Sequence, residues 1–169
     1  MGGANPWFDA CVAIGANLGD ALAVCRAAVA ELERLPGVRL MACSHWYRTE
    51  PVGPPGQPWY VNGAARVETT LTPSALLNTL LLIERDHGRD RTREVPLGPR
   101  TLDLDLLYYA DRQLDAPDLT LPHPRLHQRR FVLTPLADVA GAWRHPVAGK
   151  SVDEMLRNLD DGERVERLA

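Results

Sequence analysis

Apolar residues recur in two different periods over the first third of the chain, and each period predicts an element. Residues 8–16 form a mostly apolar run that stops at a Gly-Ala-Asn turn, which is typical of a buried strand. Over residues 18–35 the apolar positions recur every three or four residues until Pro36-Gly37, which predicts an amphipathic helix. Residues 38–47 alternate between two sets of side chains, which predicts a second strand.

The middle of the chain adds a strand, a helix and another strand. Residues 60–71 predict the third strand. Thr72-Pro73 joins an N-cap residue to a proline at the first helical position, and the helix that it begins is expected to stop at Gly88. After a loop over residues 89–100, residues 101–110 predict the fourth strand. The order βαββαβ is ferredoxin-like, so the predicted class is α+β with an antiparallel sheet covered by helices.

The last third is expected to extend this core as a C-terminal extension rather than to form a second domain. Residues 113–121 predict a hairpin strand and residues 128–139 a helix, and Ser151-x-x-Glu154 is a capping box that begins a last short helix. A length of 169 residues suits one domain with a single core. We therefore expect one domain over residues 1–169, with residues 1–9 loosely held.

Composition and charge exclude several classes of protein. Hydrophobic residues make up 45% and charged residues 24% of the chain, which excludes a disordered chain, a collagen-like fibre and a membrane bundle. A net charge of -3 argues against a general nucleic-acid binder. The chain has no run of about 18 apolar residues and no signal-peptide pattern at its start, so a cytoplasmic protein without a membrane partner is expected.

Cysteine and basic residues are used unevenly. The spacing of Cys11, Cys25 and Cys43 fits neither a disulfide framework nor a zinc site, so all three are expected to be small buried residues. Of the 19 basic residues only Lys150 is a lysine. Arginine forks bind carboxylate and phosphate through paired hydrogen bonds. A bias in genome composition would also produce this count.

The clearest chemical signal is the string Gly98-Pro99-Arg100-Thr101-Leu102-Asp103-Leu104-Asp105. Side chains alternate along a strand, so Asp103 and Asp105 are expected to project from one face with Cα atoms about 6 to 7 Å apart. Two such carboxylates repel each other, and a divalent cation removes that repulsion. The pair could hold one Mg²⁺ or share two, as in sites that clamp phosphates. The alternative is an edge strand whose charges face solvent.

An arginine-rich loop precedes this strand, among glycines and prolines that permit motion. Its arginines are Arg85, Arg89, Arg91, Arg93 and Arg100. Their guanidinium groups could reach a polyphosphate held by the two aspartates. The alternative is pairing at the surface with the interleaved acidic residues Asp86, Asp90 and Glu94.

A basic cluster follows further along the chain, at His123, Arg125, Arg129 and Arg130. Prolines on both sides of His123 restrict its backbone, so this cluster could add donors to the same phosphates. A surface turn would give the same spacing.

An aromatic cluster combines rigid backbone over residues 47–53 with Trp59, Tyr60 and the amide of Asn62. This mixture suits a flat heteroaromatic ring whose edge is read by hydrogen bonds. Alternatively, Trp59 and Tyr60 pack beneath a loop.

These clusters occur in an order that resembles a known enzyme family. The strings are Gly15-x-Asn17-x-Gly19, Tyr47-x-Thr49-x-Pro51-x-Gly53, Asn62, Gly98 through Asp105, and Pro122-His123-Pro124 through Arg129-x-Phe131. Together they are similar to 6-hydroxymethyl-7,8-dihydropterin pyrophosphokinase of folate biosynthesis, from about Val12 to Leu159. The resemblance implies a ferredoxin-like α+β fold, two Mg²⁺ ions and a monomer. It also implies that ATP donates an intact pyrophosphoryl group to the pterin hydroxymethyl oxygen, leaving AMP.

The same resemblance assigns roles to individual residues. It implies that Asp103 and Asp105 bind both magnesium ions. The implied phosphate-binding residues are Arg89, Arg91, Arg100, His123 and Arg129, of which the first three are also catalytic. The implied lining of the nucleotide pocket is Glu84, Leu106 and Thr120. The pterin would stack between Tyr60 and Phe131, with its edge read by Thr49, Pro51, Val52 and Asn62.

The chain departs from the family pattern in three places. Ala16 stands where a serine is frequent, Leu97 where a tryptophan is frequent, and Asp118 where some members have a basic residue. The arginine-rich loop is also one residue longer than in some relatives, so Arg91 and Arg93 could exchange roles.

Two other functions stay open at this point. One is another Mg²⁺-dependent nucleotidyl or phosphoryl transferase on the same fold, which would keep the aspartates without the ring slot. The other is a non-catalytic module that binds RNA or a regulatory metabolite through its arginines, which the acidic pI of about 5.9 opposes.

Overall fold

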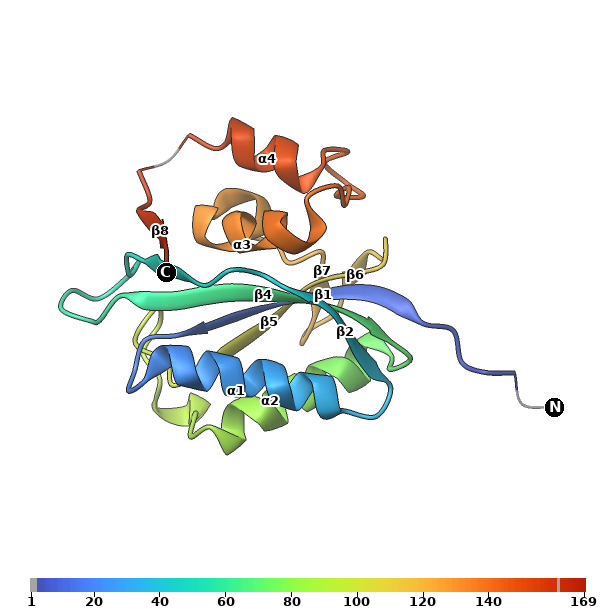
Figure 1. Cartoon of the computed structure of the whole chain (residues 1–169), viewed down its shortest axis with the longest axis horizontal. Coiled ribbons are helices and arrows are strands. Elements are labelled where there is room, and N and C mark those ends of the chain that lie inside the picture. The colour runs from blue at the N-terminus through green and yellow to red at the C-terminus, as the bar shows by residue number, and fades with distance from the viewer. Residues whose placement is uncertain (1–2, 161) are drawn as a thin grey trace.

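The computed structural model describes residues 3–160 and 162–169, and its core is an antiparallel sheet (Figure 1). The strand order is β5-β1-β4-β3-β8, and β2 also pairs with β4. Their bounds are β1 (Phe8–Ala16), β2 (Val38–Cys43), β3 (Tyr47–Thr49), β4 (Tyr60–Thr69), β5 (Asp103–Tyr109) and β8 (Val165–Arg167). A separate hairpin pairs β6 (Leu114–Asp115) with β7 (Thr120–Leu121). The order β5-β1-β4-β2 gives the βαββαβ core its ferredoxin-like arrangement, so the predicted α+β class is confirmed.

Helices cover both faces of the sheet (Figure 1). One face carries α1 (Ala21–Arg34) and α2 (Pro73–Asp86), and the other carries α3 (Arg130–Ala140) and α4 (Val152–Asn158). Each face has its own buried apolar cluster. Leu32, Leu80 and Leu104 lie in the first cluster, while Tyr108 and Leu133 lie in the second. Because side chains alternate along a strand, β1 and β5 each contribute residues to both clusters.

The predicted elements are present, and their bounds differ for local reasons. The first helix begins at Ala21 instead of residue 18, because the Asp20 side chain accepts a hydrogen bond from the Ala23 N–H at 3.2 Å and caps it there. The predicted strand 38–47 is divided into β2 and β3. The register against β4 shifts after Leu40, and the Ser44 hydroxyl, not a strand neighbour, accepts the Ala64 N–H at 2.8 Å.

Other details of the sequence prediction have mixed outcomes. Ser151 and Glu154 form the predicted capping box of α4. The expectation that all three cysteines are buried is wrong for Cys43, which is exposed at the end of β2. Of the N-terminal segment that was expected to be loose, residues 1–2 lie outside the described residues, and Phe8 already begins β1. Among residues 3–160 and 162–169, none of the helices combines the length and apolar character needed to cross a bilayer.

Candidate active site

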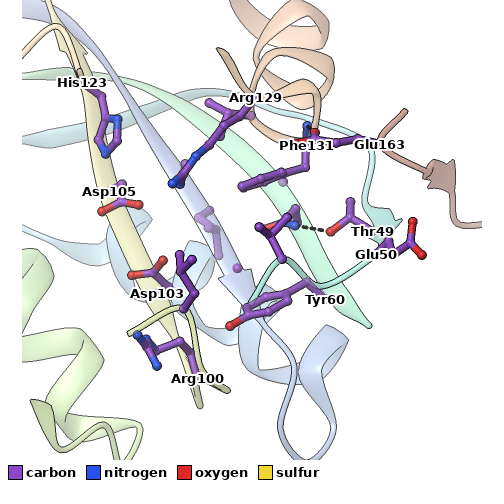
Figure 2. Close-up of a pocket in the computed structure, with 18 of the residues that line it drawn as sticks. Thr49, Glu50, Tyr60, Arg100, Asp103, Asp105, His123, Arg129, Phe131 and Glu163 are labelled. Carbon is purple, nitrogen blue, oxygen red and sulfur yellow. Dashed lines mark hydrogen bonds between the residues drawn. The ribbon is translucent and has the colours of Figure 1, made fainter. Parts of the chain in front are cut away.

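A cavity opens on the α3 face of the sheet, where β1, β4 and β5 meet the first turn of α3 (Figure 2). Most of the residues singled out from the sequence line it together. They are Thr49, Val52, Tyr60, Asn62, Arg100, Asp103, Asp105, His123, Arg129 and Phe131. Segments far apart in the chain are therefore brought to one place by the sheet.

The two aspartates face this cavity because β5 alternates. Leu104 and Leu106 point into the core beneath α1 and α2, so Asp103 and Asp105 point to the opposite face. Their register partners on β1 are Gly15 and Ala13, respectively, whose small size leaves room above the strand. Burial, together with the charge of Asp103, raises the pKa of Asp105 to about 7. A cation placed between the two carboxylates would favour their charged forms.

Arg89 neutralises Asp103 from the α2 side of the site. Its side chain is only 6% exposed, and its Nη1 donates to Asp103 Oδ1 and to Glu84 Oε2, both at 2.6 Å. It is also paired with Glu94. Glu84 accepts further hydrogen bonds from Arg91 Nη2 at 2.7 Å and from the Leu104 N–H at 2.8 Å. Glu84 is therefore a buried anchor between α2 and β5.

Arg100 is held by the first glycine-containing motif. The buried Asn17 side chain accepts the Arg100 N–H at 2.8 Å, and its amide donates to Gln57 Oε1 and Pro58 O. Asn17 thus joins the loop before β4 to the loop before β5. The Arg100 guanidinium folds back on its own loop, where it donates to the carbonyls of Gly98 and Pro99.

His123 presents one ring nitrogen to the cavity. Its backbone N–H donates to the Leu107 carbonyl at 2.8 Å, and its Nδ1 accepts the Arg125 N–H at 3.2 Å. The neutral ring therefore carries its hydrogen on Nε2. Burial lowers the pKa of His123, and the charge of Arg129 lowers it further. Figure 2 shows the His123 ring and the Arg129 guanidinium converging near Asp105.

The opposite side of the cavity is a slot with a polar edge. Asn62 Nδ2 donates to Thr49 Oγ1 at 2.6 Å, which leaves the amide oxygen of Asn62 as an acceptor. Gly15 makes room for this amide, because a Cβ at that position would come within 2.5 Å of Asn62 Oδ1. The rings of Tyr60 and Phe131 lie on this side in Figure 2, away from the aspartates.

Six predicted residues do not line the main cavity: Pro51, Glu84, Arg89, Arg91, Leu106 and Thr120. Glu84, Arg89 and Arg91 line a second hollow at the C-terminal end of α2. Pro51 follows β3, and Thr120 belongs to the small hairpin. The Leu106 side chain is buried in the core on the far face of β5.

Sequence reasoning missed some cavity residues, among them Glu50 and Glu163. Glu163 lies just before β8, a strand too short and too exposed to leave a pattern. No pattern in the neighbouring sequence predicts that Glu163 lies in the site. Leu97, which departs from the family pattern, also lines the cavity.

The aspartate pair has the chemistry to hold a magnesium ion if other ligands complete the site. Within the described part of the chain, no group of three or more His, Cys, Asp and Glu side chains could hold a metal alone. Mg²⁺ keeps several waters and is usually held by one or two carboxylates with substrate phosphates. Two carboxylates on one strand, with His123 and Arg129 nearby in the same cavity, could bind Mg²⁺ in that way.

Comparison with known proteins gives both sequence and structural matches. Residues 11–141 match the family model described as 7,8-dihydro-6-hydroxymethylpterin-pyrophosphokinase (HPPK). The chain is 45% identical over 151 residues to a 2-amino-4-hydroxy-6-hydroxymethyldihydropteridine pyrophosphokinase of Synechocystis sp., covering 89% of this chain and 76% of the relative. It is also 45% identical over 145 residues to the protein of that name from Pseudomonas aeruginosa, covering 86% and 88%.

Among solved structures, the chain is similar to the Plasmodium falciparum HPPK-DHPS bound to pteroate, with a TM-score of 0.71 and 13% identity. The match covers 93% of this chain and 43% of that longer protein, so the chain spans less than half of it. At this identity the likeness shows the fold.

Proposed function

The chain belongs to the 7,8-dihydro-6-hydroxymethylpterin-pyrophosphokinase family of folate synthesis, and on that premise we propose that it transfers the pyrophosphoryl group of ATP to 6-hydroxymethyl-7,8-dihydropterin. The hydroxymethyl oxygen attacks the β-phosphorus, the bond from that phosphorus to the α,β-bridging oxygen breaks, and AMP leaves as the hydroxyl proton is lost. One observation carries the proposal: a carboxylate pair, basic donors and an aromatic slot line the same cavity.

The two sides of the cavity separate the two substrates. We expect the pterin between Tyr60 and Phe131, with its edge toward Thr49 and Asn62 and its hydroxymethyl group toward the aspartates. The ATP phosphates would then lie near His123 and Arg129. Phosphoryl-type transfer needs in-line positioning and neutralisation of charge, and no covalent intermediate on the protein. The resemblance to the family implies a monomer, and we expect a monomer to act.

Asp103 and Asp105 would hold two Mg²⁺ ions, which would supply positive charge to neutralise the phosphates. His123 can donate through Nε2 without carrying a positive charge of its own. Arg89, Arg91 and Arg100 are engaged with carboxylates or loop carbonyls. They would exchange some of these partners for phosphate oxygens in the transition state, since a guanidinium pairs with phosphate as it does with carboxylate.

The identity of the nucleotide product tests the reaction. The protein is incubated with ATP, Mg²⁺ and the hydroxymethyl dihydropterin, and the products are separated by chromatography. We expect AMP and the pterin diphosphate in equal amounts, and no AMP when the pterin is omitted. Formation of ADP would instead indicate a simple phosphoryl transferase on the same fold.

The aspartate pair is tested by substitution. We expect Asp103→Ala and Asp105→Ala each to lower kcat by at least about a hundredfold, or about 2.7 kcal/mol of transition-state stabilisation. The fold should survive, because each change removes one of two repelling carboxylates, and Arg89 keeps its pairs with Glu84 and Glu94 when Asp103 is lost. Steady-state rates and circular dichroism of both variants measure this. Near-normal activity in either variant would contradict the metal site.

A further inference from the structure

The C-terminal segment 162–168 supports one wall of the ring slot, although it lies beyond the residues 11–141 that match the family model. β8 is the outer neighbour of β3, with Val165 opposite Thr49. The Glu50 N–H donates to the Arg164 carbonyl at 3.2 Å and extends this pairing. Thr49 in turn accepts the amide hydrogen of Asn62. The strand that reads the polar edge of the slot is therefore held from outside by β8.

Glu163 joins the same segment to the opposite wall. Its Oε2 accepts the backbone N–H of Phe131 at 3.2 Å, and the half-buried side chain lines the cavity. Figure 2 shows Glu163 directed at the first turn of α3, beside Phe131. A second hydrogen bond joins the start of α3 to the end of α4, because Arg130 Nη2 donates to the Leu159 carbonyl at 2.8 Å.

Helix α3 lacks a local cap, and this absence explains why Glu163 matters. The first N–H groups of a helix have no partner within the helix. Asp20, Thr72 and Ser151 supply that partner for α1, α2 and α4, respectively. Arg129 stands at the N-cap of α3 and makes no side-chain capping hydrogen bond, and the first turn contains no acidic residue. The Glu163 carboxylate provides the missing acceptor from 32 residues away, and its charge suits the helix N-terminus.

We propose that Glu163 is a positioning residue for the ring slot. By accepting the Phe131 N–H it fixes the start of α3, and therefore the direction in which the Phe131 side chain leaves the helix. Because β8 supports Thr49, the same short segment sets the spacing between the aromatic wall and the polar edge. The inference rests on the proposed function, since the ligand whose binding it predicts is the pterin.

The test measures pterin affinity in three variants by calorimetric titration. The protein is first saturated with Mg²⁺ and a non-hydrolysable ATP analogue, whose own affinity is measured separately. We expect Glu163→Ala to weaken pterin binding about five- to tenfold, because the pterin would then have to order an uncapped start of α3 at a cost similar to that of a lost cap. The affinity for the ATP analogue should change less than about twofold. Glu163→Gln keeps an oxygen acceptor and should bind the pterin within about twofold of the unaltered protein. Glu166→Gln is the matched control, because Glu166 lies on β8 in an exposed pair with Arg164.

Several outcomes would overturn the proposal. Unchanged pterin affinity in Glu163→Ala removes its basis, and equal losses for both ligands make Glu163 a general support of the fold. If Glu163→Gln loses as much as Glu163→Ala, the charge and not the hydrogen bond is responsible. Should Glu163→Ala fail to fold, Glu163→Asp replaces it, because the shorter side chain keeps the charge but withdraws the acceptor. A loss of about threefold or more in pterin affinity alone is then expected, and no loss overturns the proposal.

Failure of the proposed function is recognised separately. If the unaltered protein forms no AMP with the pterin, the proposed reaction is wrong whatever the variants do. If the unaltered protein is active and the Glu163 variants bind the pterin normally, only the role of Glu163 is wrong.

Discussion

Folding raises the pKa of Asp105, one of the two aspartates proposed to bind magnesium. Its pKa in the folded protein is raised to about 7 by burial and by Asp103, whereas an unfolded chain releases this proton near pH 4. Between these values the folded protein binds more protons than the unfolded chain does. The free energy of unfolding of the metal-free protein therefore falls as the pH rises from about 4 to 7, because the stabilising protonated form is lost.

Asp105→Asn should remove this pH dependence. The neutral amide cannot ionise beside Asp103, so we expect the metal-free variant to be more stable than the unaltered protein near pH 8 by roughly 1 to 2 kcal/mol. Urea unfolding in EDTA near pH 5 and near pH 8 measures the difference. Asp115→Asn, in the exposed hairpin, should show no such change. If the variant is no more stable than the unaltered protein near pH 8, the ionised Asp105 carboxylate does not destabilise the folded protein.

Phe131 and Asn62 make a second prediction at the scale of single residues. Phe131→Ala or Asn62→Ala should weaken pterin binding by roughly 1 to 3 kcal/mol, through lost stacking or an unpaired ring edge. ATP binding should remain almost unchanged, because Phe131 lies on the slot side of the cavity in Figure 2 and Asn62 is hydrogen-bonded to Thr49 there. Calorimetric titration with each ligand decides the matter. Equal losses for both ligands would mean that these residues support the whole fold.

Residue roles differ in how well the sequence predicts them. The orientation of Asp103 and Asp105 follows from strand alternation, which needs only neighbouring residues. Glu84 is different, since its partners Arg89, Arg91 and the Leu104 N–H meet it only after α2 packs against β5. Contacts between distant segments leave no period in the sequence, so the anchor was not predicted.

At the scale of elements, strong periodicity decided which predictions succeeded. The long strands and helices α1 and α2 repeat their pattern over many residues, so each was expected close to its observed bounds. β8 is three residues long and largely exposed, so no alternation marks it. The division of β2 from β3 depends on Ser44, whose hydroxyl takes the place of a backbone acceptor for the Ala64 N–H. A side chain that replaces a backbone partner in this way does not change the hydrophobic pattern, so the sequence does not predict it.

The arginine-rich loop is held at both ends and exposed between them. Arg89 anchors its start to Glu84. Near its end, Gln57 Nε2 donates to the Leu97 carbonyl at 3.0 Å and Tyr60 donates to the Gly98 carbonyl at 2.8 Å. The 3-10 turn at Arg91–Arg93 between these anchors has no buried residue. Such a segment can move over bound phosphates without disturbing the core.

Replacing residues 90–95 by a short glycine linker should therefore lower the chemical step far more than ligand binding. Arginines that approach only the transition state contribute to the rate and little to ground-state affinity, and a loss of roughly a hundredfold is expected. Single-turnover rates and the two ligand affinities measure the effect, with Arg89 and Arg100 kept in place. A proportionate loss of ATP affinity and rate would instead make the loop a fixed wall of the nucleotide site.

For the whole molecule, the net charge of -3 gives no information on where charged groups gather. Arg100, Arg129 and His123 line the same cavity as Asp103 and Asp105. This local arrangement depends on how the sheet gathers separate segments, so overall composition could not show it. Mg²⁺ bound at the aspartates would neutralise their charge, and it would also compensate the charge of the phosphates. Binding of the metal, binding of ATP and the stability of the fold should therefore depend on one another.

We therefore expect the stability of the folded protein to depend on Mg²⁺ and ATP together. A ligand present at about 100 times its Kd adds about 2.7 kcal/mol to the folded state, so Mg²⁺ with ATP should raise Tm by about 5 to 10 °C in a chain of this size. ATP in EDTA should give a much smaller rise, since the phosphates would then face two uncompensated carboxylates. In Asp103→Ala the difference between Mg²⁺ and EDTA should largely vanish, whereas Asp111→Ala, an exposed turn residue, should behave like the unaltered protein. Thermal melting curves with and without metal give the comparison. An equal rise in EDTA and in Mg²⁺ would mean that ATP binds through the arginines alone, and the aspartate pair would lose its assigned role.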